Sequence, residues 1–287
     1  MLGSRFVPYR LEEQIGRGAR SEIWRVSHER TGQTFCLKRV LRSPSEDDRF
    51  LRQAVVEYEY ARRIEDPHVR QVISLRRFRR MLRVVELHLL MEHVDGVTLE
   101  RRRPEQMPDH LALFRQVALG LAAMHDAGFL HCDIKPNNIL ISPDGSVRII
   151  DLGQCCPIHH VKKRIQGTPD YIAPEQVRRL PLDRRTDAYN LGATMYWALT
   201  GQTYPTVLRS AKGEFIPRAT TNEPPAPREL DPGIPPAMSR LVMECCQTDP
   251  TQRPRDMAEV LARLDLVEHI LSKYGPAGAT AQGSPNR

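Results

Sequence analysis

The 287-residue sequence has no uninterrupted apolar run of the roughly 18 to 20 residues that a membrane-spanning helix needs. Its first ten residues, MLGSRFVPYR, lack the apolar core of a secretion signal. The six cysteines are Cys36, Cys132 and the adjacent pairs 155–156 and 245–246, without a zinc-type C-x-x-C motif. Neighbouring cysteines rarely bridge each other, so these absences predict free thiols in a reducing cytoplasm and no membrane anchor.

The composition is that of an ordinary soluble chain, with 40% apolar and 27% charged residues. The net charge is +7, and much of it lies in arginine clusters at 76–83, 101–103, 178–179 and 184–185. None of these clusters has the interleaved aromatic residues of a nucleic-acid recognition module. We therefore expect solvated basic faces, with an acidic peptide or protein partner more plausible than nucleic acid. The oligomeric state is left open.

The order of patterns predicts an α+β chain in two lobes, joined near residues 92–96. Strand patterns occupy 9–40, about 70–75 and 83–91, with a turn at Thr31-Gly32. Helical patterns occupy about 46–64 with Ser45 as N-cap, 108–128, 184–200, 235–247 and 254–273. We expect an extension at 1–8, a small lobe at 9–92, a large helical lobe at 93–272 and a disordered tail at 273–287. The proline-rich residues 202–236 predict an irregular connection.

The segment IGRGARSEI, residues 15–23, lies between two strand patterns. Gly16 and Gly18 allow a close approach of backbone N–H groups to a phosphate, but a plain glycine-containing hairpin explains the pattern equally well. Ser21 stands where a third glycine would strengthen the phosphate interpretation.

Lys38 lies in a predicted strand between apolar neighbours, so its ammonium group needs an anion or a route to water. The following helix offers Glu57 and Glu59, which lie about 200° apart around a helix, so only one faces inward. Glu57 has apolar residues at its helical neighbours, whereas Glu59 has Arg62 and Arg63. The pattern predicts a Lys38–Glu57 pair, with a surface ion pair as the alternative.

The stretch HCDIKPNNIL, residues 131–140, concentrates polar groups before an apolar run. Asp133 can accept a proton or orient a hydroxyl, and Lys135 places a positive charge beside a transferring anionic group. Asn138 and Asp151, the latter in IIDLG, offer the hard oxygen ligands that Mg²⁺ prefers. Together these residues suit phosphoryl transfer, in which positioning and charge neutralisation dominate.

At these residues the sequence resembles the eukaryotic-type (Hanks-type) protein kinase family, over about residues 9–271. The resemblance implies a two-lobed kinase fold, with a small antiparallel sheet plus one helix and a larger helical lobe. It rests on the glycine-rich loop, Lys38, Glu57 and the segment 131–138, and on these further motifs: Asp151-Leu152-Gly153, Gly167-Thr168-Pro169, Ala173-Pro174-Glu175, Asp187 and Arg253.

The resemblance implies a serine/threonine kinase that uses ATP and Mg²⁺ and acts on protein substrates, and the basic clusters favour acidic ones. Asp133, Lys135, Lys38 and Glu57 would be catalytic, Asn138 and Asp151 would hold Mg²⁺, and Thr168 would dock the substrate. ATP would be bound by Ile15, Gly16, Arg17, Gly18, Ala19, Arg20, Ser21, Glu22, Ile23, Lys38, Glu92 and Val94. By the same resemblance Met91 is the gatekeeper of the adenine site, Glu175 and Arg253 pair in the large lobe, and Asp187 holds the catalytic loop.

Two departures from the family pattern coincide. Cys132 stands where many members have an arginine that pairs with a phosphate on the activation loop, and residues 154–167 contain no Ser, Thr or Tyr. We therefore hypothesise that activity does not require phosphorylation of this segment. Cys132 is expected to be a small buried residue, whereas Cys155 and Cys156 would be reactive only if a nearby basic group lowered their pKa.

Two alternatives are left open by the sequence. A pseudokinase would act as a nucleotide-binding scaffold, although none of Lys38, Asp133, Asn138 and Asp151 is lost. A small-molecule kinase would share the lobes, although the motifs at 167–168 and 173–175 are those of the peptide-docking segment in protein kinases.

Overall fold

The computed structural model describes residues 8–18, 20–42, 48–209, 215–217 and 224–278, and these form two compact units. Unit 1 comprises residues up to 95 together with 151–153, and unit 2 comprises 96–150 and the chain from 154 onward. None of the helices that the structure describes combines the length and apolarity needed to cross a bilayer.

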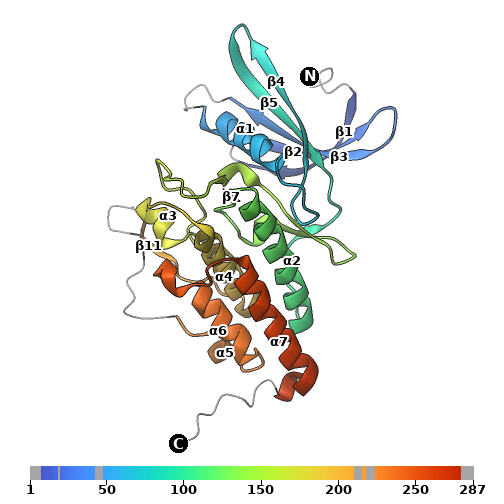
Figure 1. Ribbon diagram of the computed structural model, residues 1–287. Helices are drawn as coiled ribbons and strands as arrows, with labels where there is room; N and C mark the ends of the chain where they lie inside the picture. Colours follow the sequence, from blue (N-terminus) through green and yellow to red (C-terminus); the bar gives the residue numbers. More distant parts are fainter. Residues whose placement is uncertain (1–7, 19, 43–47, 210–214, 218–223, 279–287) are drawn as a thin grey trace, which may run out of the picture. The chain divides into compact units, whose positions relative to one another are not determined.

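Unit 1 is a five-stranded antiparallel sheet with one helix (Figure 1). The strands run in the order β1-β2-β3-β5-β4. Their bounds are β1 Tyr9–Arg17, β2 Ser21–His28, β3 Thr34–Leu41, β4 Val72–Arg80 and β5 Arg83–Glu92, and the helix α1 is Arg49–Ala61.

The register of this sheet follows from its turns and its buried side chains. Gly32, with a φ of 69°, makes the predicted turn between β2 and β3. Val26, Leu37 and Leu90, from three neighbouring strands, form a buried cluster. Helix α1 packs against β3, β4 and β5 through the same apolar periodicity that predicted it.

Unit 2 is mostly helical. Its helices are α2 Met107–Asp126, α3 Pro174–Arg178, α4 Arg184–Thr200, α5 Pro227–Leu230, α6 Pro236–Cys245 and α7 Met257–Gly278. Its strands are β6 Val97–Thr98, β7 Phe129–Leu130, β8 Ile139–Ile141, β9 Val147–Ile149, β10 Cys156–Pro157, β11 Val207–Arg209 and β12 Phe215–Pro217. Single 3₁₀ turns lie at Pro136–Asn138 and Pro250–Gln252, and another, Leu152–Gln154, contains the point in the sequence where unit 1 ends and unit 2 resumes.

Helix α4 is the centre of unit 2 and is buried on nearly every side. It packs against α2, α6 and α7. A Cβ atom on Gly192 would lie 2.5 Å from the Cβ atom of Cys245, so only glycine allows α4 and α6 to approach this closely. Gly201, with a φ of 74°, ends α4 as predicted.

The α+β, two-unit fold is confirmed, whereas several predicted boundaries differ. Helix α1 ends at Ala61 rather than 64, and the Ser45 cap lies outside the described residues. The stretch 202–236 is less irregular than predicted, because it contains β11, β12 and α5. Helix α7 continues to Gly278, and residues 279–287 of the predicted tail lie outside the described residues.

A buried ion pair joins two distant segments of unit 2, as the resemblance implied. Arg253 donates to both carboxylate oxygens of Glu175, at 2.7 and 2.9 Å, and to three backbone carbonyls. The guanidinium is fully buried and the carboxylate is 6% exposed. Removing one partner would leave the other charge buried without compensation.

We predict that Glu175→Gln lowers the free energy of unfolding by about 3 kcal/mol in urea titrations, because Arg253 loses its counter-charge. The matched control is Glu244→Gln, since Glu244 pairs with Arg263 at a site where both side chains are more than a third exposed. That control should cost less than about 1 kcal/mol. Equal losses in the two variants would contradict a special role for the buried pair.

Candidate active site

In unit 1 a lysine lies between two carboxylates. Lys38 on β3 donates from Nζ to Glu57 Oε2 at 2.7 Å and to Asp151 Oδ1 at 3.0 Å. Burial opposes the charged form of Lys38, but the two carboxylates outweigh it and raise the pKa of the ammonium group above its ordinary value. Lys38 is therefore a fixed cation, and its pairing with Glu57 is as predicted.

The helical periodicity of α1 explains why Glu57 is the partner. Glu57 lies on the buried face with Leu51, Ala54 and Ala61, and its side chain is 1% exposed. Glu59 is 41% exposed and faces an arginine of the next turn. Lys38 and Glu57 therefore form a buried, directed ion pair and not a surface one.

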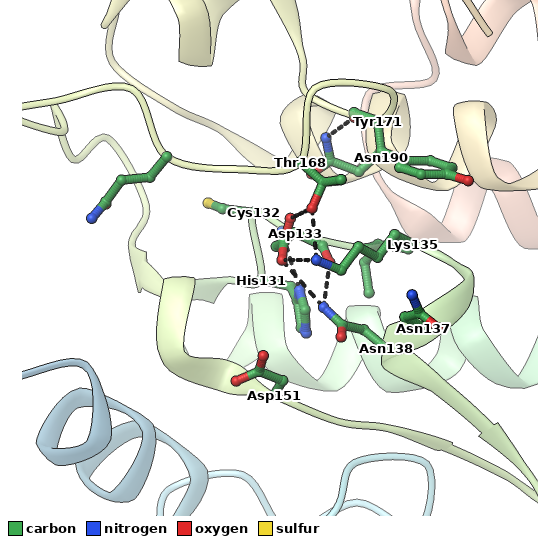
Figure 2. Close-up of polar contacts among 12 residues, drawn as sticks. His131, Cys132, Asp133, Lys135, Asn137, Asn138, Asp151, Thr168, Tyr171 and Asn190 are labelled. Carbon is green, nitrogen blue, oxygen red and sulfur yellow. Dashed lines mark hydrogen bonds and ion pairs between the residues drawn. The ribbon is translucent and has the colours of Figure 1, made fainter. Parts of the chain in front are cut away.

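In unit 2 three side chains form a closed triangle (Figure 2). Lys135 Nζ lies 2.9 Å from Asp133 Oδ2 and donates to Thr168 Oγ1 at 2.6 Å. The Thr168 hydroxyl in turn donates to Asp133 Oδ1 at 2.9 Å. Asp133 thus orients the O–H group of an alcohol, and Lys135 donates to the oxygen of that same alcohol. Activation of a hydroxyl requires a carboxylate in this position relative to the O–H group.

Asn138 is fixed by the same loop. Its Nδ2 donates to the backbone oxygen of Asp133 at 2.9 Å and to Asp133 Oδ2 at 3.3 Å. Both donors are used on one side of the amide, so its oxygen points away from Asp133 (Figure 2). The amide oxygen is the atom that can serve as a ligand for a hard cation.

Asp187, on helix α4, anchors the loop that carries Asp133 through hydrogen bonds to its backbone. This fully buried carboxylate accepts the N–H of His131 at 2.9 Å, the N–H of Cys132 at 2.7 Å, and a hydrogen bond from His125 at 2.8 Å. Burial opposes ionisation, but these hydrogen bonds and the histidine charges lower the pKa of Asp187. The anchor allows Cys132 a left-handed backbone, with a φ of 64°.

Comparison with known proteins agrees with this geometry. A family model described as protein kinase domain matches residues 9–264. The serine/threonine-protein kinase PknL of Mycobacterium tuberculosis is 32% identical over 280 residues, which cover 95% of this chain and 68% of PknL. The kinase pkn3 of Myxococcus xanthus is 29% identical, over 91% of this chain and 50% of pkn3. PknE of Mycobacterium bovis is 30% identical, over 88% of this chain and 44% of PknE.

The chain belongs to the eukaryotic-type serine/threonine protein kinase family. Members of this family are phosphotransferases. The kinase spans about two thirds of PknL and half or less of the other two relatives.

The predicted activation segment, which begins at residue 154, contacts the loop 131–138 of the kinase through two thiols. Cys132 Sγ lies 3.5 Å from Cys156 Sγ, in a buried cluster with Leu130 and Leu182. The hydrogen bond with Cys156 and burial raise the pKa of Cys132 well above its ordinary value, so Cys132 is a neutral thiol, buried as predicted. The same hydrogen bond lowers the pKa of Cys156, which is only 4% exposed.

Two residues of the kinase that sequence reasoning missed support the predicted ones. Buried Arg70 places Nη2 3.9 Å from Glu57 Oε1, an oxygen without a hydrogen bond, so Glu57 lies between two cations. Gln176 donates to the carbonyl of Cys132 at 2.8 Å and accepts the N–H of Ala173 at 2.9 Å. The available signals were an arginine three residues after Pro67 and a glutamine directly after the Ala-Pro-Glu motif.

The glycine-rich loop of the kinase is a hairpin turn between β1 and β2. Residues 15–17 end β1, residues 21–23 begin β2, and Ala19 lies outside the described residues. The N–H of Gly18 donates to the backbone oxygen of Ser21 at 2.8 Å, and a Cβ atom on Gly18 would lie 2.6 Å from Ser21 Oγ. A larger residue at position 18 would therefore have to displace the Ser21 hydroxyl.

The predicted adenine-binding segment, 92–94, begins at the last residue of β5. Met91 is fully buried, and Glu92 is the last residue of the strand. Val94 lies two residues beyond it, in chain without regular structure. The ATP contacts of these residues, and those of Arg17, Arg20 and Glu22 in the loop, stay predictions.

Each unit offers one oxygen donor of the kind that Mg²⁺ prefers. The described residues contain no group of three or more His, Cys, Asp or Glu side chains that could hold a metal. Asp151, whose side chain is 47% exposed and whose φ is 64°, offers a carboxylate, and Asn138 offers an amide oxygen. Mg²⁺ typically takes one or two such protein oxygens and completes its shell with water and substrate phosphates.

We predict that Asp187→Asn lowers the free energy of unfolding by about 3 kcal/mol at neutral pH, because the amide cannot accept all three hydrogen bonds. The folded-state pKa of Asp187 is lowered, so its ionised form stabilises the kinase fully above an unfolded pKa of about 4, and this contribution is lost as the pH falls through the folded value. The difference between parent and variant should therefore shrink in acid.

Urea titrations over a pH series measure this difference. Asp126→Asn is the control, since the side chain of Asp126 is 80% exposed. A pH-independent difference for Asp187→Asn would argue against an ionised anchor.

Proposed function

We propose that this chain transfers the γ-phosphoryl group of ATP to serine or threonine hydroxyls of protein substrates. The observation that supports this most directly is the Thr168 hydroxyl on Asp133, with Lys135 against the same carboxylate. An alcohol O–H already donates to the carboxylate at 2.9 Å, and a substrate hydroxyl would take this place.

In the proposed reaction Asp133 orients the substrate hydroxyl and accepts its proton, while Lys135 neutralises charge on the transferred group. Lys38, held by Glu57, contacts the phosphates of ATP, and Glu92 and Val94 bind adenine through their backbone. Magnesium, when bound with ATP by Asn138 and Asp151, supplies charge neutralisation at the phosphates. These assignments rest on family membership and on the contacts of each residue within its own unit.

Serine and threonine are the proposed acceptors because the relatives PknL, pkn3 and PknE bear the name serine/threonine-protein kinase. Protein substrates follow from the protein kinase domain, and acidic partners remain a proposal from the basic surface. The cytoplasm is the proposed compartment, since all six cysteines are free thiols in the structure.

We further propose that phosphorylation of the activation segment is not required for activity. Cys132 and Cys156, with their neighbours Leu130 and Leu182, dock the segment onto the loop 131–138 through thiol and apolar contacts. Lys162 adds a hydrogen bond to the backbone oxygen of Gln154. In this proposal these contacts order the activation segment, which in many members of the family is ordered by an arginine paired with a phosphate.

Asp133→Asn should lower the rate of phosphate transfer from ATP to a generic basic protein by about 10² to 10⁴-fold, because the amide cannot accept the proton. Radiolabelled ATP with Mg²⁺ measures the rate, and phosphoamino-acid analysis identifies the acceptor. Asp109→Asn, at an exposed position of α2, is the control. Equal rates in parent and Asp133→Asn would refute the proposal, and nucleotide binding without turnover in the parent would favour the pseudokinase scaffold.

Treatment with a phosphatase should leave the rate of the parent protein unchanged, because the thiol and leucine contacts of the activation segment persist without a phosphate. Mass spectrometry of residues 154–172 before and after treatment gives the phosphate content, with Thr168 and Tyr171 as the hydroxyl residues in that range. A stoichiometric phosphate there whose removal abolishes activity would overturn this part of the proposal.

A further inference from the structure

The hairpin between β4 and β5 carries the most exposed large apolar residues of the described chain. Met81 and Leu82 form its two-residue turn, and each is 93% exposed. The hairpin projects beyond the other strands of its sheet (Figure 1). The pair therefore lies at the tip of unit 1, away from the buried cluster of the sheet.

This tip is costly for the fold in three independent ways. Two large apolar side chains face water. Met81 has a φ of 55°, the left-handed region that a turn of this length normally fills with asparagine or glycine. Arg80 and Arg83 lie directly opposite each other across the strands, and like charges in that position repel. None of these three features stabilises the packing of the sheet.

The arginines surround the tip instead of forming a one-sided patch. Arg77 and Arg79 lie on one face of β4, whereas Arg80, with Arg83 opposite it, lies on the other face. All four side chains are exposed, and among the described residues no carboxylate lies within ion-pair distance of them. The nearest acidic residue on the hairpin, Glu86, is bound to Arg39 and His88.

We propose that the β4–β5 tip is a peripheral docking element for an anionic lipid surface. Met81 and Leu82 enter the boundary between headgroups and acyl chains, and the surrounding arginines bind lipid phosphates. Each basic residue near such a surface adds a favourable electrostatic contribution, and the apolar pair adds burial. Anionic phosphates between Arg80 and Arg83 would also relieve their repulsion.

The shape of the tip favours lipid over an acidic protein as the occupant. A folded partner needs an interface of roughly 1,200 Å² or more, with charge complementarity on one side. Two residues at the end of a narrow hairpin cannot supply that area, and the arginines diverge to opposite faces. A layer of anionic headgroups surrounds an inserted tip, so its phosphates can pair with the arginines on both faces of the hairpin at once.

Cosedimentation with vesicles tests the proposal without any kinase assay, so its result is independent of the proposed function. The parent protein should bind vesicles of phosphatidylcholine mixed with phosphatidylglycerol, and this binding should weaken as salt is raised. It should not bind phosphatidylcholine alone. The double variant Met81→Gly with Leu82→Ser should lose binding while retaining or gaining thermal stability, because glycine suits the positive φ at position 81 and serine removes the second exposed apolar side chain.

A second variant, Arg79→Gln with Arg80→Gln, should weaken vesicle binding roughly tenfold or more. Its matched control is Arg101→Gln with Arg102→Gln, which removes the same charge from exposed positions of unit 2 and should leave binding unchanged. Binding that is insensitive to the tip residues, or equal losses in the two arginine pairs, would overturn the proposal. So would binding to polyglutamate without binding to anionic vesicles, which would assign the tip to an acidic protein.

Discussion

The direction in which Asp133 points depends on one buried carboxylate, that of Asp187. Two N–H groups of the catalytic loop and one histidine converge on it, so the loop cannot relax from its left-handed turn at Cys132 without breaking charged hydrogen bonds. The carboxylate itself is placed by α4, the helix that is buried on nearly every side of unit 2. The chemistry proposed for Asp133 therefore rests on helix packing as much as on the loop sequence.

Gln176 and Thr168 hold the same loop through further hydrogen bonds. Gln176 binds the carbonyl of Cys132, and the Thr168 hydroxyl lies on Asp133. The segment that would dock a substrate thus shares hydrogen bonds with the residue that would accept its proton. Displacing Thr168 by an incoming hydroxyl would exchange one O–H donor for another, with little change in the charge around Asp133.

Much of the fold and part of the site could be predicted from sequence, where local periodicity decided the outcome. The inward direction of Glu57 followed from its helical neighbours, and Gly201 ended α4 as expected. Arg70 and Gln176 were missed because their partners lie at positions that only the folded chain brings near. The contact of Cys132 with Cys156 likewise depends on the pairing of β7 with β10, two strands of two residues each, too short to be read from a pattern.

The burial of every cysteine has a practical consequence for measuring the stability of this protein. All six thiols are buried, and only Cys36 belongs to unit 1, whereas the other five belong to unit 2. Cys245 lies under α4 at the glycine that lets the helices touch, so a labelling reagent reaches it only when that contact opens. Pulsed alkylation followed by peptide mapping would therefore record the opening of each unit separately, without any engineered probe.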